Sequence, residues 1–213
     1  SSNAARPATR VEEYLAEFRN DISAFVPLDV VNSYVDPNEV ERPFSTRHQY
    51  VAFVDPSGGT SDSMPLAIGH REKELTIIDV VRGNSAPFDP ESAEDEFAKV
   101  LRSYHLTQVT GDDTPANVRA GIQKRGINYT PSETPKSGLY VDLLPKLNAR
   151  TFRLVDNQRL INQLAVLERK TSRRGRDTID HPPSGHDDVA NVVAGLANCA
   201  VSRHSASVRE LRV

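Results

Sequence analysis

Three aspartates stand at comparable places in the sequence, each beside an apolar segment. Asp55 ends the run QYVAFVD, Asp112 ends TQVTGD, and Asp188 opens the final helical pattern, DVANVVAGLANC. Carboxylates gathered at one place repel one another and raise their pKa values, and a divalent cation removes that repulsion. Mg²⁺ or Mn²⁺ prefers oxygen ligands and leaves positions for water and phosphate. Two such ions about 3.5–4 Å apart would activate a water and stabilise the leaving oxygen of a phosphodiester.

Each of these acids also has a purely structural interpretation. Aspartates at strand ends commonly cap the following turn, and acidic residues suit the first turn of a helix because they oppose its dipole. What favours metal binding is the joint placement of Asp55, Asp112 and Asp188 beside three separate elements.

Asp188 is preceded by a second aspartate, Asp187, and helix geometry separates their directions. The apolar stripe of this helix consists of Val189, Val193 and Leu196. At about 100° per residue, Asp188 lies on the flank of that stripe, whereas Asp187 points nearly opposite, on the side of Asn191. We therefore expect Asp188 to be the direct metal ligand and Asp187 to cap the helix or to act as an outer ligand.

The elements that must position these acids alternate between strands and helices. Apolar runs and turn residues predict strands at 49–55, 63–72, 74–83, 107–112 and 127–131, with a further short strand at 151–155. Apolar periodicity predicts helices at 89–106, 114–126, 136–150, 157–170 and 187–199. This order favours an α/β domain with a central mixed sheet of five or more strands flanked by helices. In such sheets ligands gather beyond the carboxyl ends of the strands.

The remaining segments divide the chain into three parts. Residues 1–46 begin with SSNA, which resembles a cloning remnant, and continue with a predicted helix at 9–25 and a proline-bearing arm. We interpret 1–46 as a lead-in, 47–205 as the main domain and 206–213 as a tail.

The composition narrows the class of protein. With 38% apolar and 26% charged residues and no apolar run of membrane-spanning length, the chain is typical of a globular protein outside the membrane. The single cysteine, Cys199, excludes an internal disulfide and a cysteine-rich zinc site and fits a reducing compartment. The net charge of −3 argues against a uniformly basic nucleic-acid binder.

A local basic cluster nevertheless precedes the acid pair. It consists of Arg169, Lys170, Arg173, Arg174 and Arg176. Such a run is a solvated loop or, next to an acidic site, a flap that neutralises DNA phosphates. Two further residues have weaker roles: His186 could orient water or phosphate or be a surface residue, and Asp113 could support Asp112.

Taken in order, these segments resemble the C-terminal nuclease domain of the large terminase subunit of tailed phages and prophages. The resemblance rests on YVAFVDPSGGTSDSMPLAIGH, on VTGDDTPANVRAGIQKRGINY, and on the stretch from KSGLYVDLLPKL to GHDDVANVVAGL, and it covers about residues 49–199. It implies an RNase H-like fold, related to RuvC-type resolvases, and a Mg²⁺- or Mn²⁺-dependent endonuclease that cuts concatemeric double-stranded DNA.

The resemblance also implies residue roles. The three catalytic acids map onto Asp55, Asp112 and Asp188, with Asp62 as an auxiliary metal ligand and Asp187 as a supporting one. Related motifs often carry an aspartate where this sequence has Asn191, which puts that position in doubt as a ligand. The lead-in resembles the end of a terminase ATPase domain, but no G-x-x-x-x-G-K-S/T phosphate loop occurs in the sequence.

The implied partners are DNA, an N-terminal ATPase domain, the small terminase subunit and the portal, in the cytoplasm of a bacterial host. Two alternatives remain: a RuvC-like junction resolvase, and a non-catalytic module that docks the motor or binds DNA.

Overall fold

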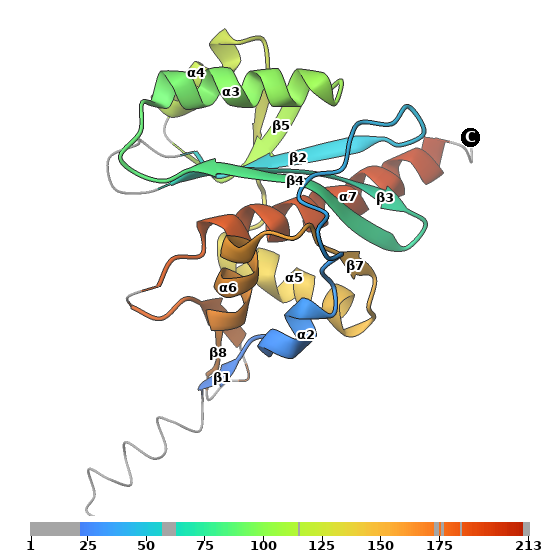
Figure 1. Ribbon diagram of the computed structural model, residues 1–213, viewed down its shortest axis with the longest axis vertical. Helices are drawn as coiled ribbons and strands as arrows, with labels where there is room; N and C mark the ends of the chain where they lie inside the picture. Colours follow the sequence, from blue (N-terminus) through green and yellow to red (C-terminus); the bar gives the residue numbers. More distant parts are fainter. Residues whose placement is uncertain are drawn as a thin grey trace, which may run out of the picture.

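The computed structural model describes residues 22–56, 63–114, 116–172, 175, 177–183 and 185–210. Its centre is a six-stranded mixed sheet with the order β6-β5-β2-β3-β4-β7 (Figure 1). The strands are β2 (Tyr50–Val54), β3 (Met64–Glu72), β4 (Leu75–Asn84), β5 (Gln108–Gly111), β6 (Asn128–Pro131) and β7 (Phe152–Arg153). The predicted α/β class with a central mixed sheet is confirmed.

Strand direction changes within this sheet. β2, β3 and β4 form the predicted antiparallel meander, whereas β5 runs parallel to β2, and β6 runs parallel to β5. Because β2 and β5 are adjacent and parallel, the residues that follow them emerge at the same edge of the sheet. This arrangement places Asp55 and Asp112 at neighbouring positions, as the sequence predicted.

Helices cover both faces of the sheet. α3 (Pro90–Ser103) and α4 (Ala116–Lys124) lie on one face, and α5 (Lys136–Asn148), α6 (Gln158–Val166) and α7 (Asp188–Glu210) lie on the other (Figure 1). α3 begins where the sequence predicted, because the Asp89 side chain accepts a hydrogen bond from the Ser92 amide and Pro90 occupies the first turn. Within the described residues, no helix is long and apolar enough to cross a membrane.

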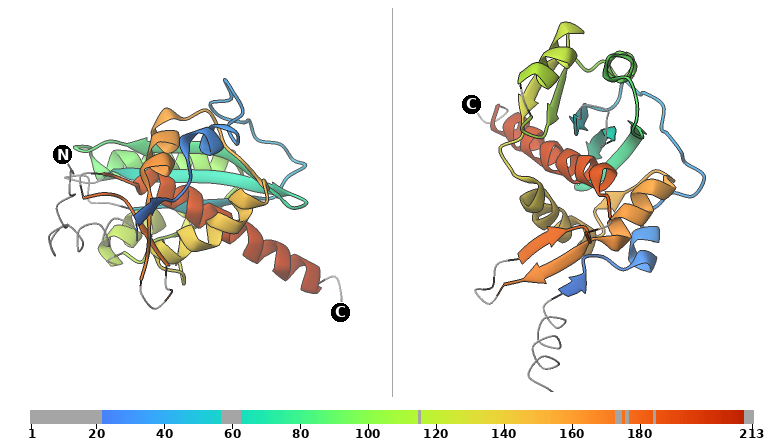
Figure 2. Two further views of the ribbon diagram at one scale, coloured as in Figure 1. Left: turned by 90° about the horizontal axis from the view of Figure 1, so that it is seen from below. Right: turned by 90° about the vertical axis from the view of Figure 1, so that its left-hand side faces the viewer.

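The alternating side chains of β2 create two hydrophobic cores. Tyr50, Ala52 and Val54 face α3 and α4, whereas Val51 and Phe53 face α7. α7 passes between the sheet and the group formed by α5, α6 and the second sheet (Figure 2). Its first turns are therefore covered on almost every side.

A small second sheet forms below the first, in the order β1-β8-β9. It consists of β1 (Ile22–Ala24), β8 (Glu168–Thr171) and β9 (Asp177–Asp180). Two predictions are wrong here. The helix expected over 157–170 ends at Val166, because the backbone becomes extended at Leu167 and the following residues pair with β9. Residues 22–24, expected at the end of a helix, pair instead with β8; residues 9–21 lie outside the described part of the chain.

The predicted boundary at residue 46 does not coincide with a break in the core. Phe25, Val26 and Val31, the last in α2 (Leu28–Asn32), are buried in the core that contains α7. The Tyr34 hydroxyl also donates a hydrogen bond to the Leu147 carbonyl, at 2.6 Å. At the other end, the α7 backbone continues past residue 205 to Glu210 and extends beyond the sheet (Figure 2).

Candidate metal centre at the ends of β2 and β5

Asp55 and Asp112 lie side by side because their strands are paired directly before them. Phe53 and Val54 of β2 are in register with Thr110 and Gly111 of β5. Gly111 permits this close approach: a Cβ atom there would lie 2.5 Å from the Val54 carbonyl oxygen and would clash with the Tyr129 hydroxyl. That hydroxyl donates a 2.6 Å hydrogen bond to the Asp112 carbonyl, which fixes the chain where it leaves β5.

Asn191 of α7 joins the two carboxylates. Its Nδ2 donates to Asp112 Oδ2 at 2.6 Å and to Asp55 Oδ2 at 3.2 Å. The residue is fully buried, and its Oδ1 is a buried oxygen without a hydrogen-bond partner among the described residues. The expectation that the Asn191 side of α7 points away from the sheet was wrong, because α7 is covered on both sides. The small residues Ala190, Ala194 and Gly195 are the sequence signal for such close packing.

Asp188 lies on one flank of this centre and is held by three side chains. Its carboxylate accepts hydrogen bonds from Arg159 Nη2 at 2.7 Å, from Gln163 Nε2 at 2.6 Å and from the Ser63 hydroxyl. Burial acts to raise the pKa of Asp188, but the hydrogen bonds from Ser63 and Gln163 and the charge of Arg159 outweigh it, and the pKa is lowered. Asp188 is therefore ionised at neutral pH.

Asp187 lies on the other flank, directly before α7, and is only 3% exposed. Its carboxylate accepts hydrogen bonds from Lys136 Nζ at 2.5 Å and from the Tyr140 hydroxyl at 3.0 Å. Asp187 thus points into the protein towards α5 instead of away from it. Sequence reasoning missed four site residues, since single polar residues on amphipathic helices form no distinctive pattern. They are Lys136, Tyr140, Arg159 and Gln163.

Asp55 and Asp112 are partly buried acids without enough nearby positive charge to hold their pKa values at the ordinary level. Burial, followed by repulsion from Asp112, raises the pKa of Asp55 to about 7, although the Asn191 hydrogen bond and Lys136 act in the opposite direction. Burial also raises the pKa of Asp112, with Asp187 adding to the effect. An arrangement of this kind favours a cation that stabilises both carboxylates.

Of the other predicted site residues, those that the structure describes lie apart from this centre. Asp113 is exposed and lies 3.8 Å from Arg119, and His186 is exposed. Arg169 and Lys170 lie in β8, where they pair with Asp177 at 2.5 Å and with Glu168 at 3.4 Å. Asp62, Arg173, Arg174 and Arg176 lie outside the described residues.

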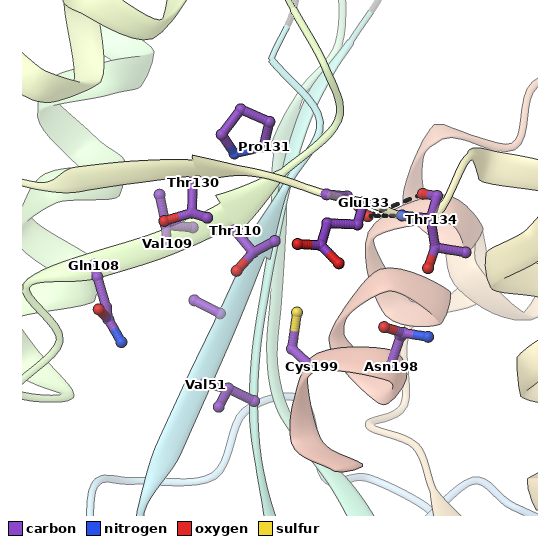
Figure 3. Close-up of a pocket in the computed structure, with 12 residues that line it drawn as sticks. Val51, Gln108, Val109, Thr110, Thr130, Pro131, Glu133, Thr134, Asn198 and Cys199 are labelled. Atoms are coloured by element: carbon purple, nitrogen blue, oxygen red, sulfur yellow. Dashed lines mark hydrogen bonds between the residues drawn. The ribbon is translucent and has the colours of Figure 1, made fainter. Parts of the chain in front are cut away.

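A separate hollow of about 600 Å³ lies between α7 and the strands β5 and β6 (Figure 3). Thr110, Glu133 and Cys199 are among its lining residues, but Asp55, Asp112, Asp187 and Asp188 are not. The candidate site is therefore defined by the carboxylates and not by this larger cavity.

The sheet order and the carboxylates at its switch point define an α/β protein of the RNase H-like type. No family model and no curated protein matches the sequence. Solved structures do match. The large terminase nuclease from the thermophilic phage G20c with bound magnesium is 16% identical, with a TM-score of 0.63 over 82% of this chain and 95% of that one.

Two further structures agree with this result. The bacteriophage HK97 large terminase is 13% identical, with a TM-score of 0.65 over 84% of this chain and 44% of that chain. The nuclease domain of the Thermus phage P74-26 large terminase is 18% identical, with a TM-score of 0.60 over 82% of this chain and 93% of that one. The chain thus has the RNase H-like fold of large terminase nuclease domains, and it spans less than half of the HK97 protein.

Proposed function

We propose that this chain is the nuclease domain of a tailed-phage DNA-packaging terminase. It would be a metal-dependent endonuclease that cuts concatemeric double-stranded DNA by hydrolysing phosphodiester bonds. The observation that carries the proposal is the pair Asp55 and Asp112 at the ends of adjacent parallel strands, bridged by Asn191. The fold is shared with terminase nucleases, one of which contains magnesium.

The residues present fit a hard divalent cation. The centre offers carboxylate oxygens and Asn191 Oδ1, which has no partner among the described residues, and oxygen donors are the ligands that Mg²⁺ and Mn²⁺ prefer. We assign Asp55, Asp112 and Asp188 as the principal ligands and Asp187 as a supporting one. Two bound ions would lower the pKa of an attacking water and stabilise the leaving oxygen.

Neighbouring side chains hold the carboxylates of this centre in position. Asn191 holds Asp55 and Asp112 together by donating to both. Arg159 and Gln163 fix the ionised Asp188 from one side. Lys136 is 38% exposed and carries positive charge at the rim, where it can attract a DNA phosphate while it neutralises Asp187.

We further propose partners for the full-length protein. Because the chain spans 44% of the HK97 large terminase, the remainder would include an N-terminal ATPase domain, and the small terminase subunit and the portal would be partners in the host cytoplasm. Asp62 as an auxiliary ligand, and Arg173, Arg174 and Arg176 as phosphate-binding residues, remain part of the proposal.

A plasmid assay tests the activity. With Mn²⁺ or Mg²⁺ the purified chain should nick and linearise supercoiled DNA, EDTA should stop the reaction, and Ca²⁺ should support cleavage poorly because its looser coordination misplaces the water. Asp55→Asn should abolish cleavage with circular dichroism unchanged, whereas Asp113→Asn, an exposed neighbour of the site, should cleave normally.

The alternatives predict different results in the same assay. Cleavage that persists in EDTA would contradict the metal-dependent mechanism. A strong preference for four-way junctions over plasmid would identify a resolvase. A docking module would show no cleavage and no effect of Asp55→Asn on DNA binding.

A further inference from the structure

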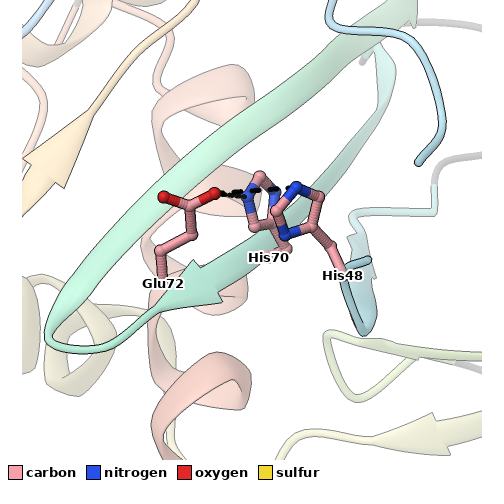
Figure 4. Close-up of side chains that lie close together, drawn as sticks. All are labelled: His48, His70 and Glu72. Atoms are coloured by element: carbon pink, nitrogen blue, oxygen red, sulfur yellow. Dashed lines mark ion pairs between the residues drawn. The ribbon is translucent and has the colours of Figure 1, made fainter. Parts of the chain in front are cut away.

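A second group of potential metal ligands lies at the opposite end of the sheet from Asp55. It consists of His48, His70 and Glu72 (Figure 4). Glu72 Oε1 lies 3.6 Å from His48 Nε2 and 3.5 Å from His70 Nε2, and the three donor atoms lie within 4.8 Å of one another. His70 and Glu72 are two residues apart on β3, so they share a face of the strand.

The His70 side chain is buried and is held in one orientation, with Nε2 available as a metal ligand. It is 4% exposed, and its Nε2 is buried without a hydrogen-bond partner among the described residues. Its Nδ1 lies 2.6 Å from Oδ2 of Asp79, which is 1% exposed. The ionised Asp79 carboxylate accepts from Nδ1–H, and in the neutral ring this tautomer leaves the Nε2 lone pair to bind a metal. Metal-binding histidines are commonly held in this way by a second carboxylate.

A β-bulge creates the contact between His70 and Asp79. Ile68 is in register with Val80 and Gly69 with Ile78, so Asp79 is an extra residue on β4. Bulges of this kind redirect a side chain. The Asp79 carbonyl also accepts a 2.8 Å hydrogen bond from the Arg42 amide, which ties the segment before β2 to the bulge.

We propose that His48, His70 and Glu72 bind a transition-metal ion of the zinc class, distinct from the ions of the nuclease centre. Two imidazoles and one carboxylate suit Zn²⁺ and not Mg²⁺, which favours oxygen alone. Donors around a tetrahedral zinc lie about 3.3 Å apart, given bonds of roughly 2.0–2.1 Å, and Glu72 already lies close to that separation from both histidines.

This ion would connect the segment before β2 to the β3–β4 hairpin. His48 precedes β2, and Glu72 ends β3 beside the turn to β4. Seven positions separate His48 from Asp55, which is roughly 20 Å of extended chain. The site is thus independent of the carboxylate centre, and the inference does not depend on the proposed nuclease activity.

Zinc binding to the full chain tests the proposal. In an Asp55→Asn, Asp112→Asn background, which weakens the carboxylate centre, equilibrium dialysis should find one tightly bound Zn²⁺ per chain. NMR of ¹⁵N-labelled imidazoles should show Zn²⁺, but not Mg²⁺, shifting the His48 and His70 Nε2 signals. His48→Gln and Glu72→Gln change partly exposed side chains, so they should keep the fold and lower zinc affinity at least tenfold.

A matched control addresses a competing cluster. Asp180, His181 and Asp187 also lie close together, so His181→Gln should leave the stoichiometry and the affinity for zinc unchanged. If Zn²⁺ binds no better than Mg²⁺, or if His48→Gln has no effect, Glu72 forms only ion pairs with the two histidines and the proposal is overturned. Loss of zinc in His181→Gln alone would likewise overturn it by placing the ion elsewhere.

Discussion

At Asp55, the arrangement that suits a cation is unfavourable for the metal-free protein. Burial and the neighbouring Asp112 raise its pKa to about 7, above the ordinary value of 3.8. The stabilising contribution of this group is therefore complete below the unfolded pKa and is lost as the pH rises through about 7. One pKa unit corresponds to about 1.4 kcal/mol, so the loss is on the order of a few kcal/mol before relaxation.

The first prediction follows from this loss of stability at high pH. In EDTA, Asp55→Asn should increase the free energy of unfolding at pH 8 by on the order of 2 kcal/mol, which raises the melting temperature by roughly 5 °C. The gain should shrink towards pH 5, where wild-type Asp55 is protonated. Thermal melts across this range measure it, with Asp113→Asn as the control expected to show little change. An equal gain at both pH values would mean that Asp55 is not the titrating group.

The second prediction separates the two acids that flank the centre. Asp188→Asn should cost more cleavage activity than Asp187→Asn, because the Asp188 side chain is 15% exposed, whereas the Asp187 side chain is 3% exposed and is held by Lys136 and Tyr140 of α5. Asp187→Asn should cost more unfolding free energy, about 1–3 kcal/mol, because it breaks a buried pair whose lysine can partly reach water. Cleavage kinetics and urea unfolding measure the two effects. If Asp187→Asn is the more damaging to cleavage while the fold remains intact, the roles are reversed.

At the scale of elements, the close contact between α7 and β2 sets the position of Asn191. A Cβ atom at Gly195 would lie 2.5 Å from the Phe53 ring, closer than carbon atoms can approach. The third prediction is that Gly195→Ala moves α7 away from β2, costs about 1–3 kcal/mol in stability and reduces cleavage. Chemical unfolding and plasmid cleavage measure both effects.

A second substitution makes this prediction specific. Phe53→Leu removes the ring edge and should recover part of the stability that Gly195→Ala removes. The coupling is measured as a double-mutant cycle, with an expected interaction of about 1 kcal/mol. Strictly additive effects on stability would show that Gly195 does not pack against Phe53.

Much of the main sheet could be predicted, because each of its strands has a recognisable pattern within its own short stretch of sequence. β2, β3 and β4 are apolar runs separated by turns, and the acids follow strands that the apolar pattern identifies. The second sheet could not be predicted in this way, because β8 is a charged segment, ERKT, that suits a helix as well as a strand. Its pairing with β1 joins residues far apart in the sequence.

The candidate site was predictable to a similar degree. Asp55 and Asp112 could be placed together by strand topology, whereas the direction of Asn191 could not be predicted from one apolar stripe. A helix buried on two sides has no polar face, so the single-stripe assumption fails. Small residues show that such a helix is closely packed, but not which polar side chain meets the sheet.

At the scale of the whole molecule, the proposed function requires a chain of net charge −3 with an acidic centre to bind a polyanion. The basic residues between β8 and β9 are the candidates for that role. The fourth prediction is that alanine at Arg173, Arg174 and Arg176 weakens binding about equally for unrelated DNA sequences. The dependence of log affinity on log salt should flatten by roughly one unit for each phosphate that is no longer neutralised.

The control for this experiment lies in the same hairpin. Arg169 is paired with Asp177 at 2.5 Å, so Arg169→Ala should change the salt slope much less than the triple variant. Salt titrations with Ca²⁺ in place of a cleaving metal provide the comparison. Parallel slopes for the wild type and the triple variant would show that the three arginines do not bind phosphate, and the run would then be a solvated loop.

The burial of α7 also determines the order in which parts of the molecule open to solvent. Residues 189–194 and 196–197 are all less than 4% exposed, and they lie between the sheet and α5. Their amide protons can exchange with solvent only when α7 separates from both the sheet and α5, which is close to global unfolding. The four-residue strands β8 and β9 can open locally at a much smaller free-energy cost. Asn191, which joins Asp55 and Asp112, therefore lies in a segment whose amides we expect to exchange slowly, whereas Arg169 and Lys170 lie in a strand that we expect to exchange early.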